Sequence, residues 1–488
     1  MIEQAPDRLL LTDGRLNGAK TTFASLNPAT GAVVGHAPDA GPAEAEAAIA
    51  AARRAFDTTT WATDRDLRAR CLDQLHRTLV EHREELRALT IAEVGAPHQL
   101  TAGAQLEEPI GVVRWYADLL PTYEFSRDLG VTEARGARHR RWVEKEAAGV
   151  VAAIIPYNYP TQIALAKITP ALAAGCTVVL KGAPDTPLVT LALGELIAEH
   201  TDIPPGVVNV LSSSGAAVGE LMTTHPDVDV VTFTGSTPTG RRIMAAASGT
   251  VKRVFLELGG KSAMVVLDDA DFQAASMMAA FMSCSHAGQG CAICTRLLVP
   301  RAHHDEIVDL VAQGLAHIPV GDPADPAVYM GPLISERQRD KVDAMVRRAV
   351  ADGAKLVCGG ERMPGPGFYY RPTLLAGVDP DSEIAQEEVF GPVLSVIPYD
   401  DRPDDAGAVR IANNSAYGLS GAVFSASEER AVNVARRIRS GTFSINGGNY
   451  FAPDSPFGGY KQSGIGREYG VEGLEEFLET KTFGVVAQ

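Results

Sequence analysis

The chain has 488 residues, of which 45% are apolar and 21% charged, a balance typical of a globular protein with two or three domains. Its formal net charge of −16 argues against nucleic acid and anionic membrane surfaces as partners, and no apolar run reaches the roughly 18 residues of a membrane span. The N-terminus lacks the pattern of a signal peptide, and six scattered cysteines do not form a disulfide framework, so we expect a cytoplasmic protein.

The first predicted element is a helix over residues 42–56, where alanine is frequent and the helix propensity is high. Asp39 lies just upstream and is the candidate N-cap of that helix. Residues 139–146 read His-Arg-Arg-Trp-Val-Glu-Lys-Glu, which looks extended but is too polar for a buried sheet. Two interpretations of this segment stay open: an outer-edge strand that pairs with another subunit, or a solvated surface loop.

From residue 149 onward, short apolar runs alternate with helical patterns. This alternation predicts βαβ units and a parallel sheet buried on both faces, followed by a second α/β region. The expected strands span residues 150–155, 176–180, 207–211, 228–233, 262–267 and 295–299, and the expected helices span residues 161–174, 187–200, 216–224, 239–247, 272–283 and 303–314.

A candidate dinucleotide site follows the apolar run at 228–233. Gly235 and Ser236 lie where this strand turns into a helix, and Gly240 lies at the start of the helix. Such a glycine lets the backbone approach a pyrophosphate, and the helix N-terminus offers free N–H groups. The spacing is not G-x-G-x-x-G, however, and a structural turn explains it equally well. Lys181 ends another strand and can bind ribose or phosphate there, although a solvated loop lysine is the common alternative.

A thiol, a carboxylate and an amide are the candidate catalytic groups. Cys291 lies in Gly-Gln-Gly-Cys-Ala, where small neighbours leave room for a substrate and free N–H groups for an oxyanion. Glu257 precedes two glycines, and its carboxylate can act as a base, although alone it reads as a surface glutamate. Asn158 offers a second oxyanion donor, or is a turn asparagine beside proline.

Cys291 and Cys294 also form a C-x-x-C pair. A zinc site needs a second pair or histidines at ligand spacing, which the sequence lacks, so we expect no metal. A dithiol redox pair is the other alternative, in which oxidation of Cys294 with Cys291 would inactivate an enzyme. A buried, reduced neighbour is the simpler interpretation of Cys294.

Together these residues resemble the aldehyde dehydrogenase superfamily, in sequence order and over nearly the whole chain. The motifs that carry the resemblance are Pro-Tyr-Asn-Tyr-Pro at residues 156–160, Phe-Thr-Gly-Ser at 233–236, Glu-Leu-Gly-Gly-Lys-Ser at 257–262, Gly-Gln-Gly-Cys at 288–291, Glu-Glu-Val-Phe-Gly-Pro at 387–392, Asn-x-x-Ala-Tyr-Gly-Leu at 413–419 and Pro-Phe-Gly-Gly-Tyr-Lys-x-Ser-Gly at 456–464.

The resemblance implies an α/β fold with a Rossmann-like dinucleotide-binding domain, an α/β catalytic domain and a small β oligomerisation arm. We expect residues 1–124 and 148–258 to form the first domain, 259–460 the second, and 125–147 with 461–488 the arm and C-terminal segment. The family's assemblies imply a homodimer or homotetramer, which favours arm pairing for the polar strand discussed above.

The resemblance also implies the role of each site residue. Cys291 is expected to be the nucleophile, Asn158 and the N–H of Cys291 to hold the oxyanion, and Glu257 to activate the water that releases a carboxylic acid. The presence of Glu257 favours hydrolysis over acyl transfer to coenzyme A. The expected cofactor is NAD, with NADP possible, held by Lys181 at the adenosine ribose, Ser236 at the pyrophosphate, Glu388 at the nicotinamide ribose and Phe390 near the ring, together with Ile155, Pro156, Pro184, Gly235 and Gly240.

Two positions depart from the family's pattern. Tyr157 stands where tryptophan is usual. Pro184 stands where NAD-preferring members often carry a glutamate that binds the ribose 2′-hydroxyl and repels a 2′-phosphate. Asp185, the next residue, can substitute for that glutamate if the loop shifts. We therefore expect NAD preference with weakened discrimination against NADP.

The expected substrate is a small-molecule aldehyde of apolar or aromatic character. Aromatic residues, without lysine or arginine, occupy the segments that line the family's substrate tunnel, although several of them can equally be core. These residues are Trp115, Tyr157, Tyr159, Tyr450, Phe451 and Phe457. The alternatives from other classes are a cofactor-free thiol hydrolase or esterase and a non-catalytic structural relative.

Overall fold

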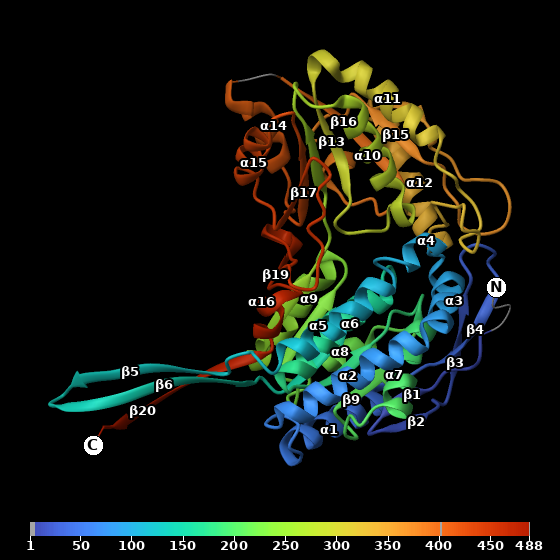
Figure 1. Ribbon diagram of the computed structural model, residues 1–488. Helices are drawn as coiled ribbons and strands as arrows, with labels where there is room; N and C mark the ends of the chain where they lie inside the picture. Colours follow the sequence, from blue (N-terminus) through green and yellow to red (C-terminus); the bar gives the residue numbers. More distant parts are fainter. Residues whose placement is uncertain (1–4, 401–402, 488) are drawn as a thin grey trace.

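The computed structural model describes residues 5–400 and 403–487, which fold into two lobes and a long projecting arm (Figure 1). The ends of the predicted domain scheme, residues 1–4 and 488, lie outside the described residues, as do residues 401–402 of the predicted catalytic domain. Among the described residues, no helix combines the length and the apolar character needed to cross a bilayer.

The first lobe is built on a sheet with a parallel centre and antiparallel outer strands. From one edge to the other its strands are β19 (Gly464–Ile465), β11 (Arg253–Glu257), β10 (Val230–Thr234), β7 (Val150–Ile154), β8 (Thr177–Lys181), β9 (Val208–Leu211), β1 (Leu10–Thr12) and β2 (Arg15–Asn17). A separate antiparallel pair, β3 (Thr22–Leu26) and β4 (Val33–Pro38), lies beside it.

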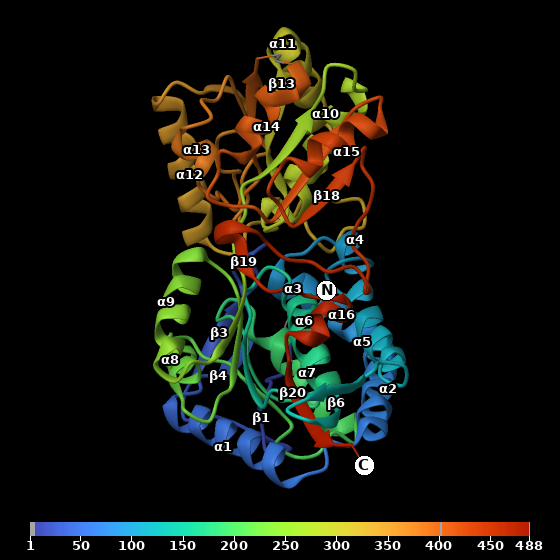
Figure 2. The same ribbon diagram turned by 90° about the vertical axis from the view of Figure 1, so that its left-hand side faces the viewer.

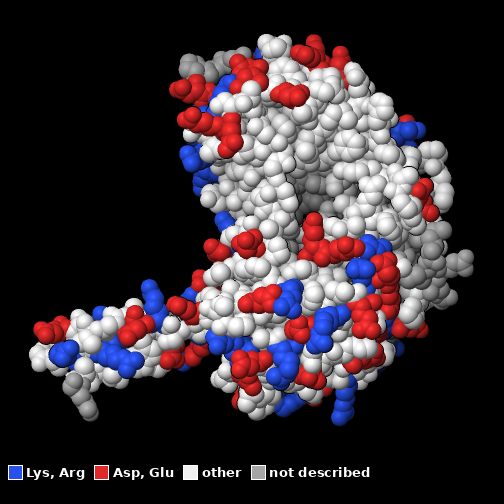
Figure 3. Space-filling view, viewed as in Figure 1, with Lys and Arg blue, Asp and Glu red and all other residues white. Residues whose placement is uncertain are grey.

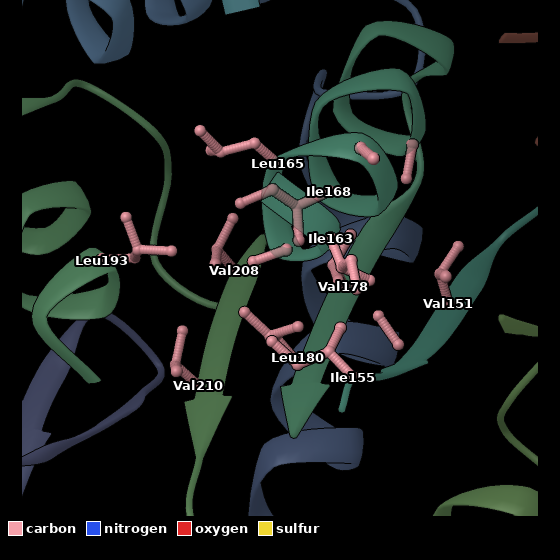
Figure 4. Packing of buried hydrophobic residues seen from close by; sticks show 14 of the residues in the cluster. Val151, Ile155, Ile163, Leu165, Ile168, Val178, Leu180, Leu193, Val208 and Val210 are labelled. Carbon is pink, nitrogen blue, oxygen red and sulfur yellow. The ribbon is translucent and has the colours of Figure 1, made fainter. Parts of the chain in front are cut away.

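Helices cover both faces of this sheet, which is why its central strands are mostly apolar and buried. The first lobe holds α1 (Pro42–Thr58), α2 (Arg65–Glu81), α3 (Arg83–Val94), α4 (His98–Thr101), α5 (Glu107–Leu119), α6 (Pro160–Ala174), α7 (Pro187–His200), α8 (Ala217–Thr224), α9 (Thr237–Ala247) and α16 (Gly470–Glu475). Helices α1, α8 and α9 pack on one face and α6 and α7 on the other. Figure 4 shows Ile163 and Ile168 of α6 beside Val178 of β8, in a fully apolar layer.

The order of the strands marks a binding edge. Strands β7, β8 and β9 follow one another toward one edge of the sheet, and β10 and β11 then add on the other side of β7. The strand order therefore reverses between β7 and β10, and open parallel sheets bind ligands beyond the carboxyl ends of their strands at such a point. Pro156 follows β7 and Gly235 follows β10 at this edge.

The second lobe is a second α/β unit, shown above the first in Figures 1 and 2. From edge to edge its strands are β14 (Lys355–Cys358), β15 (Thr373–Ala376), β16 (Val393–Tyr399), β13 (Cys294–Pro300), β12 (Ser262–Val266), β17 (Ser420–Phe424) and β18 (Thr442–Ile445). Its helices are α10 (Phe272–Cys284), α11 (His304–Ala316), α12 (Glu336–Ala351), α13 (Glu383–Gln386), α14 (Ala406–Asn413) and α15 (Glu428–Arg436). The chain enters this lobe directly from β11, through residues 258–261.

The arm is an antiparallel sheet in the order β20-β6-β5, formed by β20 (Leu478–Val486), β6 (Ala137–Ala147) and β5 (Ser126–Ala134). The polar segment 139–146 lies within β6, so it is a strand and the loop interpretation is wrong, but β6 is the middle strand of the arm and not an outer-edge strand. The rings of Trp142 and Phe483 stack across the arm at 5.0 Å, and Lys481 pairs with Glu146 at 2.6 Å.

The predicted C-terminal segment 461–488 is divided between two parts of the molecule. Its final strand joins the arm, whereas β19 joins the sheet of the first lobe and α16 packs against α6.

The predicted cap of α1 is wrong. Gly41 occupies the N-cap position, and the carboxylate of Glu44 accepts a hydrogen bond from its N–H at 2.9 Å. The carboxylate of Asp39 instead accepts hydrogen bonds from the N–H and the hydroxyl of Ser214, at 2.9 and 2.7 Å. Proline is the first helical residue and has no N–H that needs a partner. Glu44 is the third helical residue, the position from which a capping-box carboxylate reaches back to the N–H of the N-cap residue.

Candidate active site

An outer cavity of about 380 Å³ opens at the binding edge of the first sheet, between α8 and α9. Ile154, Lys181 and Phe233 lie in its floor at the strand ends, and Glu220 and Arg242 line its helical walls. Lys181 is buried, and its ammonium donates to the carbonyl of Gly182 at 3.1 Å. Burial lowers the pKa of Lys181 to about 8, and the charge of Asp39 opposes that shift.

A middle cavity of about 200 Å³ lies at the point where the strand order reverses. It is lined from the first lobe by the loops after β7, β10 and β11, and from the second lobe by α12 and the residues that follow α13. Its lining residues include Pro156, Tyr157, Gly235, Ser236, Gln338, Lys341, Glu388 and Phe390.

An inner cavity of about 390 Å³ adjoins the middle one and carries a group of aromatic side chains. Tyr159, Tyr450, Phe451 and Phe457 are among its lining residues, and Tyr469 joins them, while their assignment to a substrate tunnel stays a prediction. No lysine or arginine is among the described residues that line it. In space-filling view a hollow separates the two lobes, with acidic side chains on its lower rim (Figure 3).

Cys291 lies where the middle and inner cavities meet. Cys291, Asn158 and Thr234 line both cavities, whereas Glu257 lines only the inner one and Glu388 only the middle one. A reactant in either cavity can therefore reach the same sulfur.

The loop before Cys291 is held by Gln289. The Gln289 side chain donates to the carbonyls of His286 and Pro332 at 3.1 and 3.3 Å, and its oxygen accepts from the N–H of Ile334 at 2.9 Å. Gly288 has φ of +72°, and a Cβ there would lie 2.1 Å from the carbonyl oxygen of Gly391. The glycine and glutamine of the Gly-Gln-Gly-Cys motif are thus needed to present the thiol.

The electrostatic surroundings of Cys291 favour the neutral thiol. Burial raises the pKa of Cys291, and the negative charges of Glu388, Glu257 and Glu468 raise it further. A thiolate therefore needs a base or an added positive charge close to it.

Asn158 is buried beside the sulfur. Its amide donates to the carbonyl of Gln289 at 2.8 Å, and its backbone carbonyl accepts from Gln105 at 2.7 Å. The bond to Gln289 orients the side-chain amide and occupies one of its two N–H donors, and the bond from Gln105 holds the backbone. The second N–H of the amide is left for an oxyanion.

Glu257 ends β11 and its carboxylate is buried in the wall of the inner cavity. Neither carboxylate oxygen has a hydrogen-bond partner among the described residues. A Cβ at Gly458 would lie 2.7 Å from one of these oxygens, so glycine leaves the space that the carboxylate occupies. Burial raises the pKa of Glu257 well above its ordinary value, Glu468 raises it further, and Lys167 opposes the shift.

A buried ion pair that sequence reasoning missed lies behind Glu257. The ammonium of Lys167 contacts Glu468 at 3.0 Å and the hydroxyl of Thr232 at 2.9 Å, and lies 4.9 Å from the centroid of the Phe255 ring. Lys167 is fully buried, and Glu468 lines the inner cavity. A lysine in the otherwise apolar helical run 161–174 was the available signal, since a buried charge needs a partner.

Glu388 and Phe390 face the middle cavity from the second lobe. Glu388 accepts from the N–H of Gly260 at 2.9 Å, and a Cβ at Gly259 would lie 2.6 Å from its other oxygen. Phe390 has φ of +59° and meets the ring of Tyr157 edge-on at 6.0 Å. Glycine is thus required where the motif Glu-Leu-Gly-Gly-Lys-Ser meets Glu388.

Several predicted site residues lie elsewhere than expected. Tyr157 lines the middle cavity instead of the inner one. Trp115 lines neither of these cavities and packs edge-on against Tyr116 at 4.8 Å, so its assignment to the substrate tunnel is wrong. Ile155 is buried in the core, and its neighbour Ile154 reaches the outer cavity in its place.

Two more cofactor predictions need correction. Gly240 serves packing, because a Cβ there would lie 2.7 Å from the side chain of Leu258. Pro184 is exposed and is not in the lining of the outer cavity. Asp185 faces the second lobe, where its carboxylate lies 3.7 Å from Arg337, so it does not replace the expected glutamate.

Other lining residues carried no sequence signal of their own. Apart from the carboxylate of Glu108, they are small, apolar or amide side chains whose role depends on where the fold places them. In the inner cavity they are Ala104, Glu108, Gln162, Ile163, Met282, Ser285, Ile293 and Asn449.

Comparison with known proteins agrees with this geometry. Residues 16–483 match the Aldehyde dehydrogenase family. The chain belongs to this family. A 3-succinoylsemialdehyde-pyridine dehydrogenase from a Pseudomonas species is 42% identical to it over 463 residues, which cover 93% of each chain.

Solved structures of aldehyde dehydrogenases share the whole fold. That of a Mycobacterium tuberculosis aldehyde dehydrogenase complexed with NAD+ has 40% identity and a TM-score of 0.94, over 99% of each chain. A mutant of aldehyde dehydrogenase C from Pseudomonas syringae, in complex with NAD+ and octanal, has 40% identity and a TM-score of 0.92 over 99% of this chain and 98% of that one. The family and the α/β fold class predicted from the sequence are therefore confirmed.

Proposed function

We propose that this aldehyde dehydrogenase oxidises apolar or aromatic aldehydes to free carboxylic acids with NAD, through a thioester on Cys291. The observation that carries the proposal is the position of the Cys291 sulfur between the middle and inner cavities. A dinucleotide ring in the first and an aldehyde in the second would meet at this sulfur.

The outer and middle cavities fit a dinucleotide. Lys181 offers a buried ammonium that donates to the neighbouring carbonyl of Gly182, and Glu388 offers acceptor oxygens for ribose hydroxyls. Gly235 and Ser236 lie at the N-terminus of α9, where free N–H groups suit a pyrophosphate. When bound, NAD+ supplies a hydride acceptor and a positive ring that favours the thiolate.

In the first half of the reaction the Cys291 thiol loses its proton to water, the thiolate sulfur bonds to the aldehyde carbon, and the carbonyl π pair moves to oxygen as an oxyanion. The N–H of Cys291 and the free amide N–H of Asn158 stabilise this oxyanion. As the C=O bond of the thiohemiacetal reforms, its carbon releases a hydride, which a bound NAD+ would accept, and a thioester on Cys291 remains.

In the second half Glu257 removes a proton from water, whose oxygen bonds to the thioester carbon. The bond between carbon and the Cys291 sulfur then breaks, the carboxylic acid leaves, and the thiolate is restored. The unpartnered carboxylate of Glu257 in the inner cavity supports this role, and its presence favours water over coenzyme A as the acceptor.

The lining of the inner cavity supports the proposed substrate class. Its aromatic walls favour apolar or aromatic groups, and Glu108, Glu257 and Glu468 disfavour an anionic aldehyde. Octanal, the aldehyde bound by the Pseudomonas syringae enzyme, is of this apolar kind.

We also propose a homodimer or homotetramer located in the cytoplasm. The arm exposes Val131, Val485 and Val486 on a sheet that extends away from the lobes, which suits pairing with another copy. All six cysteines are free, which suits a reducing compartment.

The test is a panel of aliphatic, aromatic and carboxylate-bearing aldehydes, with NADH formation followed by absorbance and the product acid identified. We expect turnover of the neutral aldehydes and none with Cys291→Ala, while Cys358→Ala, a half-buried cysteine of β14, retains activity. Turnover by Cys291→Ala, or a cofactor-free hydrolysis that exceeds the oxidation, would overturn the proposal.

A further inference from the structure

The loop between β4 and α1 brings a carboxylate to the binding edge of the first sheet. Asp39 N donates to the carbonyl of Thr21 at 2.8 Å, and Ala40 N donates to the carbonyl of Ser212 at 3.0 Å. The hydroxyl of Ser212 donates to the carbonyl of Pro38 at 2.5 Å. The backbone on both sides of Asp39 is therefore fixed against the loop after β9.

Asp39 lies on the side of this edge where Lys181 is found. Strands β8 and β9 are neighbours, Lys181 is paired with Leu211, and the N–H of Gly182 donates to the carbonyl of Leu211 at 3.0 Å. The carboxylate of Asp39 holds Ser214, two residues before Ala216, which lines the outer cavity together with Lys181. Asp39 is also the charge that opposes the lowering of the pKa of Lys181.

The usual glutamate of this region has no substitute in its own loop. Pro184 carries no charge and is exposed, and Asp185 is directed to Arg337 of the second lobe. Glu220, the carboxylate that lines the outer cavity, is paired with Arg242 at 2.5 Å, so Asp39 is a second carboxylate near this end of the sheet, brought from a different part of the chain.

Within the proposed function, on which this inference rests, we propose that Asp39 sets the cofactor preference. Asp39 does not line the outer cavity, so it acts at a distance: its negative charge repels a 2′-phosphate on the adenosine ribose held at Lys181, and the enzyme prefers NAD over NADP despite Pro184. Asp39 acts on the cofactor through its charge, and its bonds to Ser214 keep that charge at the edge of the cavity.

The experiment measures the Kd of NAD and of NADP by titration calorimetry for wild type, Asp39→Asn and Asp39→Ser. Asparagine removes the charge and keeps one acceptor oxygen for the N–H of Ser214, while its NH2 group replaces the oxygen that accepts from the Ser214 hydroxyl. We expect the ratio of the NADP Kd to the NAD Kd to fall by roughly tenfold or more in both variants, the effect of removing one nearby like charge. Thermal unfolding of each variant checks that it is folded.

Two further variants separate the explanations. Asp57→Asn, at the far end of α1 and paired with Arg53, removes an equal charge and should leave the ratio unchanged. Asp185→Asn tests the neighbouring acid. A ratio that moves in Asp185→Asn and not in Asp39→Asn or Asp39→Ser overturns the inference, as does wild type that binds NADP as tightly as NAD. Failure of wild type to bind either dinucleotide would instead contradict the proposed function.

Discussion

Glu257 illustrates how a single residue's surroundings decide what it can do. Its carboxylate is buried, lacks a hydrogen-bond partner among the described residues and is influenced by the charge of Glu468. These surroundings raise its pKa and favour the neutral form, and only the ionised fraction can accept a proton. The same burial that raises its pKa makes the ionised form a stronger base.

Replacement of Glu257 tests its role in releasing the acid. In Glu257→Gln we expect a rapid first burst of NADH, because thioester formation does not need this base, followed by steady turnover reduced about 10²- to 10⁴-fold. Stopped-flow absorbance measures both phases. Glu199→Gln, an exposed glutamate of α7, is the matched control. Unchanged steady turnover in Glu257→Gln would refute the assignment.

The pH dependence of turnover should follow the pKa of Glu257. Because only the ionised carboxylate accepts a proton from water, the rate of acid release should rise as pH rises through the raised pKa. Glu468→Gln removes a negative charge beside it, which lowers the pKa of Glu257 and moves the rising limb to lower pH. Profiles of kcat against pH measure the shift; a move to higher pH would contradict this account.

The sequence predicted the reactive residues better than the residues that surround them. Cys291, Glu257, Asn158 and Glu388 lie in motifs where glycine marks a close approach, and the structure brings all of them to the two adjoining cavities. Trp115 was misplaced because the sequence cannot tell which side of a half-buried helix faces a cavity.

Among the elements, α7 shows how one buried carboxylate can organise a helix. Glu93 of α3 accepts from the N–H groups of Leu188 and Val189, both at 2.8 Å, and from the hydroxyl of Ser25 at 2.7 Å. These N–H groups belong to the first turn of α7, which has no side-chain cap of its own. Glu93 is fully buried, so no water replaces these bonds.

Removal of this carboxylate should destabilise the first lobe. Glu93→Ala leaves buried donors unsatisfied, and we expect the free energy of unfolding to fall by about 2–5 kcal/mol. Denaturant unfolding measures the change. Glu84→Ala, an exposed glutamate on the same helix, should cost much less, because solvent screens its ion pairs. An equal decrease in the free energy of unfolding in the two variants would show that the buried hydrogen bonds of Glu93 add no stability beyond that of an exposed glutamate.

Glu93 should also give stability a pH dependence. Burial raises the pKa of Glu93 to about 7 from an ordinary value of 4.5. Its folded form thus binds a proton more tightly than its unfolded form, and this contribution is present below pH 4.5 and is lost as pH rises through 7. Glu93→Gln cannot titrate and should unfold with a flatter pH dependence in this window. A slope unchanged from wild type would refute the assignment.

Elements were predictable where their pattern was continuous. The strands β7 to β10 lie within one or two residues of the apolar runs, because both faces of the sheet are covered and most of their side chains are apolar. The cap of α1 was not predictable in this way. Asp39 has the residue type of an N-cap, but the loop after β9 competes for its carboxylate, and that contact exists only in the folded chain.

At the scale of the whole molecule, the arm is the part that extends furthest from the two lobes (Figure 1). It is tied to the first lobe at its base, where Arg253 donates to the carbonyl of Leu478 at 2.7 Å, and its far end extends from the body (Figure 1). Such a sheet gains little core of its own, which supports the proposed pairing with another copy of the chain.

Charge on the exposed arm valines should therefore disrupt assembly. We expect Val131→Asp combined with Val485→Asp to shift the protein toward monomers, because a charged side chain in an apolar interface is costly. Light scattering after size-exclusion chromatography measures the mass. Val350→Asp, an exposed valine of α12, is the control. An unchanged mass in the double variant would place the interface elsewhere.

Because Cys291 lines both the middle and the inner cavity, the proposed dinucleotide and aldehyde would reach its sulfur through different cavities. A compound that plugs the aromatic passage would leave the nucleotide free to come and go, and would act as a non-competitive inhibitor toward NAD. The freed acid can likewise depart without waiting for NADH. Binding and release of one reactant would thus not be blocked by the other, although both contact the same sulfur.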